Sequence, residues 1–151
     1  MQKIMTFLMF NDRAGEAIDF YTSVFKNSKK LSTMPGPDGK VMGGTFELEG
    51  QRFSAFNGGP HFTFSQGISQ FVSCETQDEI DYYYDALSEG GEKDRCGWVK
   101  DKFGVSWQIV PPVLGELLSS TDRAKAERVM QAMLKMHKLD INVLNEAAAG
   151  E

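Results

Sequence analysis

An internal repeat limits the folds that this sequence can adopt more than any other feature of the chain. The run EAIDFY at residues 16–21 recurs as DEIDYY at residues 78–83. Each copy follows a short apolar run and precedes segments that have the composition of β-strands. A repeat at this spacing indicates two copies of one supersecondary unit, because neither copy can bury its apolar face alone.

Composition narrows the class of protein. With 151 residues the chain can bury a core within one domain, and 41% hydrophobic with 25% charged residues is ordinary for a globular protein. The net charge of −5 argues against a nucleic-acid partner, and no apolar stretch is long enough to span a membrane. Cys74 and Cys96 have neither disulfide nor metal-ligand spacing, and no secretory pattern precedes them. We therefore expect reduced thiols and a cytoplasmic location.

The first repeat unit is expected at about residues 1–59. It begins with a strand at 3–10, after which Asn11 or Asp12 can cap a helix. That helix has an apolar face at 3.6-residue spacing, formed by Ala14, Ala17, Ile18, Tyr21 and Phe25. Residues 34–40 read as a loop rich in Pro and Gly, and residues 41–57 as a hairpin that turns near residues 49–51.

The second unit is expected at residues 60–112. A strand at 69–74 precedes a helix that starts at a capping box, in which Glu79 follows Thr76 by three residues. The buried face of this helix is predicted to contain Ile80, Tyr83, Tyr84 and Leu87, and the glycines at 90 and 91 end it. Strands are predicted at 95–99 and 105–110, with the indole of Trp107 in the core.

Residues 113–151 have no counterpart in the repeat and are predicted to form a helical extension. Ser120 or Thr121 can cap its main helix, and Asp140 can cap a short last one. One face of the main helix gathers Ala126, Val129, Met130, Met133, Leu134 and His137, so that His137 is expected to serve in packing. Such a face must be covered, either by the same chain or by a partner.

Several runs of the sequence resemble one protein superfamily. AIDFYTSVF at 17–25 and DKFGVSWQIVP at 101–111 are similar to segments of the vicinal oxygen chelate superfamily, which includes glyoxalase I, bleomycin-resistance proteins and extradiol dioxygenases. Residues 56–64, 96–110 and 127–141 resemble its PhnB-like branch, whose members often carry the label demethylubiquinone methyltransferase. The resemblance implies an α+β fold in which two βαβββ units form a curved mixed sheet, together with a homodimeric assembly.

In metal-dependent members of that superfamily, four strand positions hold the metal, and the resemblance places them on this chain. The first falls at Thr6 or Met5, and the second at Phe53 or Ser54. The third falls among residues 68–70, and the fourth is Gln108. First-row divalent metals prefer imidazole, carboxylate or thiolate ligands, and none of these positions supplies one. We therefore expect no metal and no cofactor at this place.

Uncharged side chains are instead the candidates for contact with a small molecule. The residues that we expect to bind it are Asn57, His61, Gln70, Cys96, Trp98 and Gln108. Each has a simpler alternative. His61 is either a ligand contact or general base, or a loop residue bonded to backbone. Cys96 and Trp98 either line a cup or pack, and the amides either bind a ligand or remain from a lost metal site.

These observations leave two main hypotheses and a weaker third. The protein is either a metal-free module that binds a small, partly apolar organic molecule, or an enzyme of lyase, isomerase or oxygenase type that uses His61 or a metal in unexpected geometry. A methyltransferase would need a site for S-adenosylmethionine, commonly a Gly-rich loop between a strand and a helix. The glycines at 43–44 and 58–59 lie within or between predicted strands, so that this reading has little support.

Overall fold

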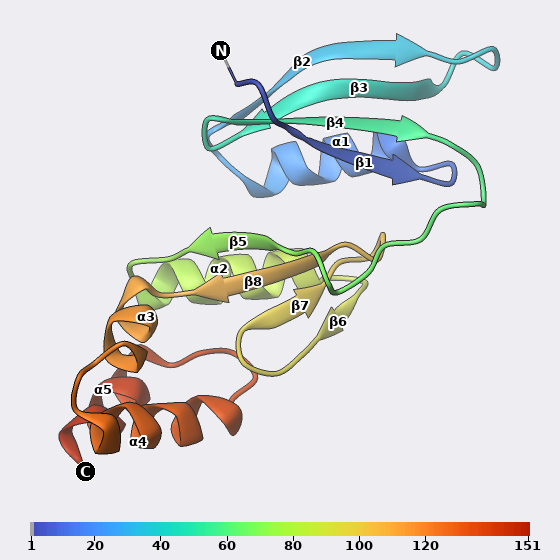
Figure 1. The fold of residues 1–151 in the computed structure, drawn as a ribbon. Coiled ribbons are helices and arrows are strands. Elements are labelled where there is room, and N and C mark those ends of the chain that lie inside the picture. Colours follow the sequence, from blue (N-terminus) through green and yellow to red (C-terminus); the bar gives the residue numbers. More distant parts are fainter. Residues whose placement is uncertain (1) are drawn as a thin grey trace. The chain divides into compact units, whose positions relative to one another are not determined.

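The computed structural model describes residues 2–151 and divides into two compact units (Figure 1). Unit 1 ends at Phe64 and unit 2 begins at Ser65. The boundary thus falls a few residues after the glycines at 58–59, and the ring of Phe64 lies edge-on to that of Phe10, with the centroids 5.3 Å apart. The C-terminal extension belongs to unit 2.

Unit 1 is a four-stranded mixed sheet with one helix. Its elements are β1 (Thr6–Phe10), α1 (Ala14–Val24), β2 (Ser28–Pro35), β3 (Val41–Leu48) and β4 (Gln51–Asn57). The strand order is β1-β4-β3-β2, in which only β1 and β4 run parallel. The predicted hairpin is confirmed, because Glu49 and Gly50 both have positive φ and form the two-residue turn that such hairpins favour.

Two local predictions for unit 1 are wrong. The predicted loop at 34–40 is shorter, because Met34 and Pro35 are the last residues of β2. This strand was not predicted, since it is an edge strand that lacks apolar alternation and is almost wholly exposed. Neither Asn11 nor Asp12 caps α1: its N-cap is Arg13, which makes no side-chain cap bond. The predicted apolar face is nevertheless buried, and α1 lies against β3.

Unit 2 repeats the same topology, as the sequence repeat predicts. Its elements are β5 (Gln70–Ser73), α2 (Gln77–Ser88), β6 (Glu92–Lys93), β7 (Trp98–Lys100) and β8 (Ser106–Val110). The order is β5-β8-β7-β6, with β5 and β8 parallel. The hydroxyl of Thr76 accepts from the Glu79 amide, which confirms the predicted cap, while the Glu79 carboxylate accepts from the Glu75 amide. The α+β fold class is confirmed.

The predicted strand at 95–99 is wrong over its first half. Cys96 and Gly97 form a turn before β7, with φ values of 58° and 84°. Close approach explains the glycine: a Cβ at position 97 would lie 2.7 Å from the Ile109 carbonyl oxygen and 3.0 Å from Leu139. Cys96 therefore does not alternate with Trp98 along a strand.

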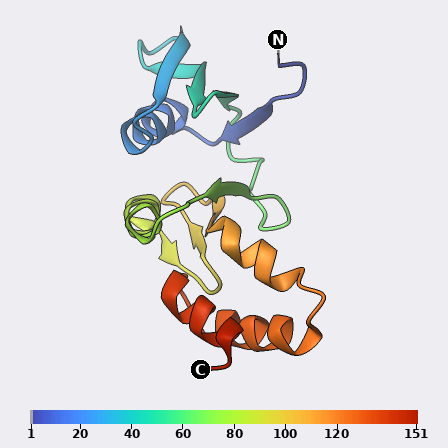
Figure 2. The ribbon, with the colours of Figure 1, turned by 90° about the vertical axis from the view of Figure 1, so that its left-hand side faces the viewer.

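The extension forms three helices, α3 (Pro112–Leu118), α4 (Arg123–Leu134) and α5 (Ile141–Ala149), and Figure 2 shows α4 and α5 lying side by side in unit 2. The first helix was not predicted, although Pro at its first position suits a helix start. Asp122, rather than Ser120 or Thr121, caps α4, and Asp140 caps α5 as predicted. His137 lies beyond the end of α4 and is exposed, so that its predicted place on the apolar face is wrong.

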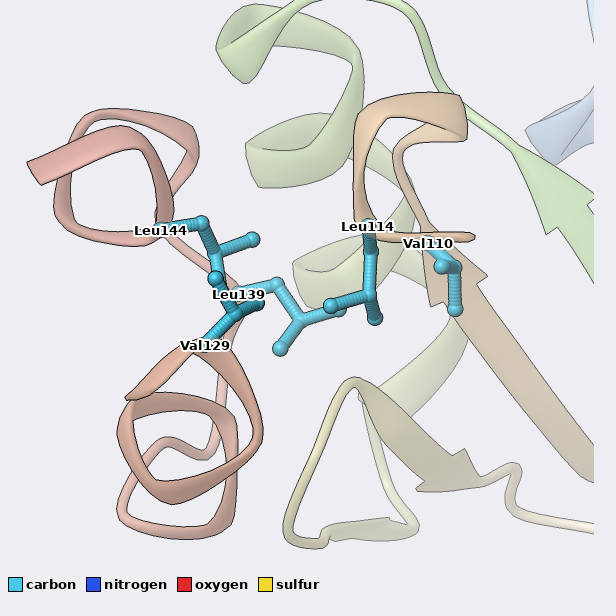
Figure 3. Close-up of a cluster of buried hydrophobic side chains, with 5 residues drawn as sticks. All are labelled: Val110, Leu114, Val129, Leu139 and Leu144. Atoms are coloured by element: carbon cyan, nitrogen blue, oxygen red, sulfur yellow. The ribbon is translucent and has the colours of Figure 1, made fainter. Parts of the chain in front are cut away.

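The extension packs within its own chain. A buried cluster joins β8 to all three helices and to the loop before α5 (Figure 3), and it consists of Val110, Leu114, Val129, Leu139 and Leu144. Burial of each such side chain contributes roughly 1.5–3 kcal/mol. Polar contacts add to it, since the side chain of Gln77 bonds both the Leu139 carbonyl and the Ile141 amide. Of the two open alternatives, the chain thus adopts intramolecular docking.

Candidate functional site

A pocket of about 370 Å³ lies in unit 2 between the strands and the extension. This volume is within the range of small-molecule sites. Its lining is formed by Phe71, Cys96, Trp98, Gln108, Val110, Pro111, Pro112, Leu114, Gly115, Leu118 and Met133. Three of the six residues predicted to bind a ligand, Cys96, Trp98 and Gln108, are therefore brought together here.

Strand register explains how the centre of the pocket is built. Gln108 on β8 stands opposite Phe71 on β5 and opposite Trp98 on β7. Residues that face each other across neighbouring strands point to the same side of the sheet. The amide of Gln108 therefore lies between two aromatic side chains, one from each neighbouring strand.

The polar groups of the pocket are few and uncharged. The Nε2 of Gln108 donates to the hydroxyl of Ser69 at 2.9 Å, which orients the amide and leaves its carbonyl oxygen as an acceptor for a ligand. The thiol of Cys96 contacts the Met133 carbonyl oxygen at 3.6 Å. No side chain that lines the pocket carries a charge. An ion would lose its hydration here without a charged partner, so that the pocket suits a neutral molecule.

Asp101 holds the strand that carries Gln108, a role that the sequence analysis missed. Its side chain is 2% exposed and accepts from the amides of Phe103 and Val105 and from the indole of Trp107, the last at 2.9 Å. These bonds tie the turn between β7 and β8 to the buried Trp107, whose predicted place in the core is confirmed. The sequence feature that could have indicated this role is the run DKFG at 101–104, a turn in which Gly104 has a φ of 94°.

Gln70 lies away from this pocket. It stands opposite Trp107 in the strand register, one position from the pair formed by Phe71 and Gln108. Successive side chains of a strand point to opposite faces of the sheet. Gln70 is therefore on the face that carries Trp107, and it does not line the pocket.

The other two predicted residues, Asn57 and His61, belong to unit 1. The carbonyl oxygen of the Asn57 side chain accepts from the Ala14 amide at 2.8 Å, and so caps the start of α1 from the end of β4. His61 is exposed in the turn that follows β4. Unit 1 has its own pocket of about 400 Å³, lined by residues that include Phe7, Thr45 and Ser54, but neither Asn57 nor His61 lines it.

The side chains at the four strand positions do not fit a first-row metal. Thr6, Ser54, Ser69 and Gln108 offer neutral hydroxyl and amide oxygens, whereas such metals favour charged oxygen, thiolate or imidazole ligands. Within residues 2–151, no three His, Cys, Asp or Glu side chains gather where they could share a metal ion.

The strand-to-helix turns also lack the features that commonly hold S-adenosylmethionine. Residues 11–13 join β1 to α1, residues 74–76 join β5 to α2, and Pro111 joins β8 to α3. None of these connections contains a glycine, so that none matches a Gly-rich loop. Burial raises the pKa of the Cys74 thiol in the second turn to about 12, which keeps it protonated and poorly nucleophilic.

Comparisons with known proteins identify relatives. A model of the family described as 3-demethylubiquinone-9 3-methyltransferase matches residues 2–110. The solved structure of a PhnB protein from Bacillus cereus is 38% identical, with a TM-score of 0.68, and the match covers 73% of this chain and 99% of that one. A structure from Pseudomonas aeruginosa, at 21% identity and a TM-score of 0.61, shares the fold over 73% of this chain and 96% of its own. Among curated proteins, no sequence matches.

No helix within residues 2–151 combines the length and the apolar character that are needed to cross a bilayer.

Proposed function

The chain belongs to the 3-demethylubiquinone-9 3-methyltransferase family, whose relatives include a PhnB protein, and we propose that it is a metal-free module that binds a small, neutral, largely apolar molecule. The observation that carries the proposal is the pocket of unit 2. It brings Cys96, Trp98 and Gln108 together with residues of α3 and α4, which complete the wall around them.

The lining of the pocket indicates the kind of ligand. Phe71 and Trp98 flank the Gln108 amide on neighbouring strands, and aromatic side chains favour stacked or edge-on contact with a flat ring. The Gln108 carbonyl oxygen selects for one hydrogen-bond donor on the ligand. A flat, uncharged molecule that carries a hydroxyl or amide N–H fits this combination.

Binding, rather than methyl transfer, is the function that these residues support. The family description names a methyltransferase, yet none of the three connections from a strand to a helix in residues 2–151 resembles the usual loop for the methyl donor. The exposed His61 belongs to unit 1, whereas the proposed pocket lies within unit 2.

A titration with 2-naphthalenemethanol, a flat neutral alcohol, tests the proposal. We expect saturable shifts of the Trp98 indole and Gln108 amide signals in ¹H–¹⁵N NMR spectra. Trp98→Ala should weaken binding about tenfold or more, because a buried apolar side chain contributes roughly 1.5–3 kcal/mol. Gln108→Leu should weaken it less, through loss of one hydrogen bond worth about 1 kcal/mol.

Ser54→Ala is the matched control, since Ser54 lines the pocket of unit 1. It should leave the affinity unchanged. An affinity that falls in Ser54→Ala and is unchanged in Trp98→Ala would place the ligand in unit 1 and contradict the proposal, as would an absence of saturable shifts.

A further inference from the structure

We propose that Met133, in the C-terminal extension, limits the size of the molecules that can enter the pocket of unit 2. The extension is thereby the part of the chain that determines which ligands fit. The biological meaning of this inference rests on the proposed binding function, but the geometry can be tested without a ligand.

Side chains of the extension form one wall of the pocket. Leu114 and Leu118 come from α3 and Met133 from α4, whereas Phe71, Trp98 and Gln108 come from the sheet. Met133 also borders the buried cluster around Val129, so that its position is set by the core of the extension. A Met side chain has three rotatable bonds and adapts to irregular contacts, which suits a wall that meets ligands of different outline.

The extension also positions the part of the pocket that Cys96 and Trp98 form. The amides of Cys96 and Gly97 donate to the carbonyls of Met136 and His137, both at 2.8 Å. These bonds hold the turn that precedes Trp98 in its positive-φ conformation. Residues that follow α4 therefore determine where the Cys96 thiol and, through β7, the Trp98 ring lie.

The base of this wall is firmly anchored. Val129, Leu139 and Leu144 are fully buried, and the guanidinium of Arg128 donates to the carbonyls of Ala147 and Ala148 near the end of α5. Met133, by contrast, is only partly buried. A change at Met133 should accordingly alter the pocket while the helices stay in place.

The helices of this wall lie outside the residues that the family model matches. The family model ends at residue 110, whereas α3 begins at Pro112. The match to the Bacillus cereus structure covers 99% of that chain but only 73% of this one. About a quarter of this chain therefore has no counterpart in the Bacillus cereus structure. The proposed size limit therefore depends on residues outside the range that the family model matches.

Alkylation of Cys96 by neutral maleimides of different size provides the test. The thiolate sulfur adds to the maleimide double bond, and a proton from water completes the addition. Cys96 lines the pocket, whereas Cys74 is 0% exposed and serves as an internal unreactive site. Mass spectrometry of the intact chain and its peptides gives the rate at Cys96 for N-ethylmaleimide and for the larger N-(1-pyrenyl)maleimide.

Met133→Ala should raise the ratio of the pyrenyl rate to the ethyl rate about tenfold, as expected when a few methylene groups are removed from a pocket wall. Met133→Leu, which nearly preserves volume, should leave the ratio unchanged. Leu134→Ala is the matched control: Leu134 is the next residue of α4, 48% exposed and outside the pocket lining. Thermal unfolding of each variant verifies that it is folded.

An unchanged ratio in folded Met133→Ala overturns the inference, as does an equal rise in Leu134→Ala. The outcome is separable from that of the proposed function. If 2-naphthalenemethanol fails to bind but the ratio rises, the size limit stands and the binding proposal falls. If the alcohol binds through Trp98 and the ratio stays constant, the binding proposal stands and the size limit falls.

Discussion

At the scale of single residues, buried hydrogen-bond acceptors matter most, and Asp101 is the chief example. Its carboxylate accepts two backbone amides and the Trp107 indole inside unit 2. We predict that Asp101→Asn lowers the free energy of unfolding by about 2–3 kcal/mol, because an amide N–H₂ then faces a donor in a buried site. Urea titration followed by tryptophan fluorescence measures the change. Asp38→Asn, in an exposed loop, should change stability by less than about 0.5 kcal/mol. Equal losses in the two variants would contradict the role given to Asp101.

At the scale of elements, the start of α1 depends on a residue from another strand. The Asn57 side chain at the end of β4 accepts the Ala14 amide, whereas the neighbouring Asn11 supplies no cap. We predict that Asn57→Ala costs about 1 kcal/mol of stability, the usual value of a helix cap. Amide hydrogen exchange at Ala14 should quicken in the same variant. Asn11→Ala is the control and should leave both quantities near those of the parent chain. If Asn11→Ala has the larger effect, Asn11 rather than Asn57 caps α1, and the prediction is wrong.

At the scale of the whole molecule, we propose a homodimer. Large apolar side chains are exposed on strands of both units, Phe7 to 54% and Phe71 to 60%, and such surface favours association. Sedimentation velocity at micromolar concentration should give twice the chain mass of 16.8 kDa. Because the extension buries Val110 of β8 within its own chain, removal of residues 113–151 should abolish cooperative unfolding rather than merely release a monomer. A full-length chain that sediments as a monomer would contradict the dimer.

Local patterns in the sequence determined much of the architecture. The repeat predicted two equivalent units, and the glycine turn at residue 50 and the caps at Thr76 and Asp140 are all present. The turn and the two caps each involve residues a few positions apart, so that backbone propensity and side-chain spacing are enough to reveal them. The apolar face of α1 was found for the same reason, because helical periodicity is itself a local property. The face of α2 was found in part: Ile80, Tyr84 and Leu87 are buried, whereas Tyr83 is only half-buried.

Only the tertiary structure decided the site. Asn57 caps a helix 43 positions away, and Cys96 leaves its predicted strand because Met136 and His137 bind the turn that contains it. Met133 reaches the pocket because α4 docks through Val129 onto the core of unit 2. These contacts join segments that are distant along the chain. Neutral residues such as Gln and Trp also carry no diagnostic spacing, so that their convergence depends on the packing of strands and helices rather than on any pattern along the sequence.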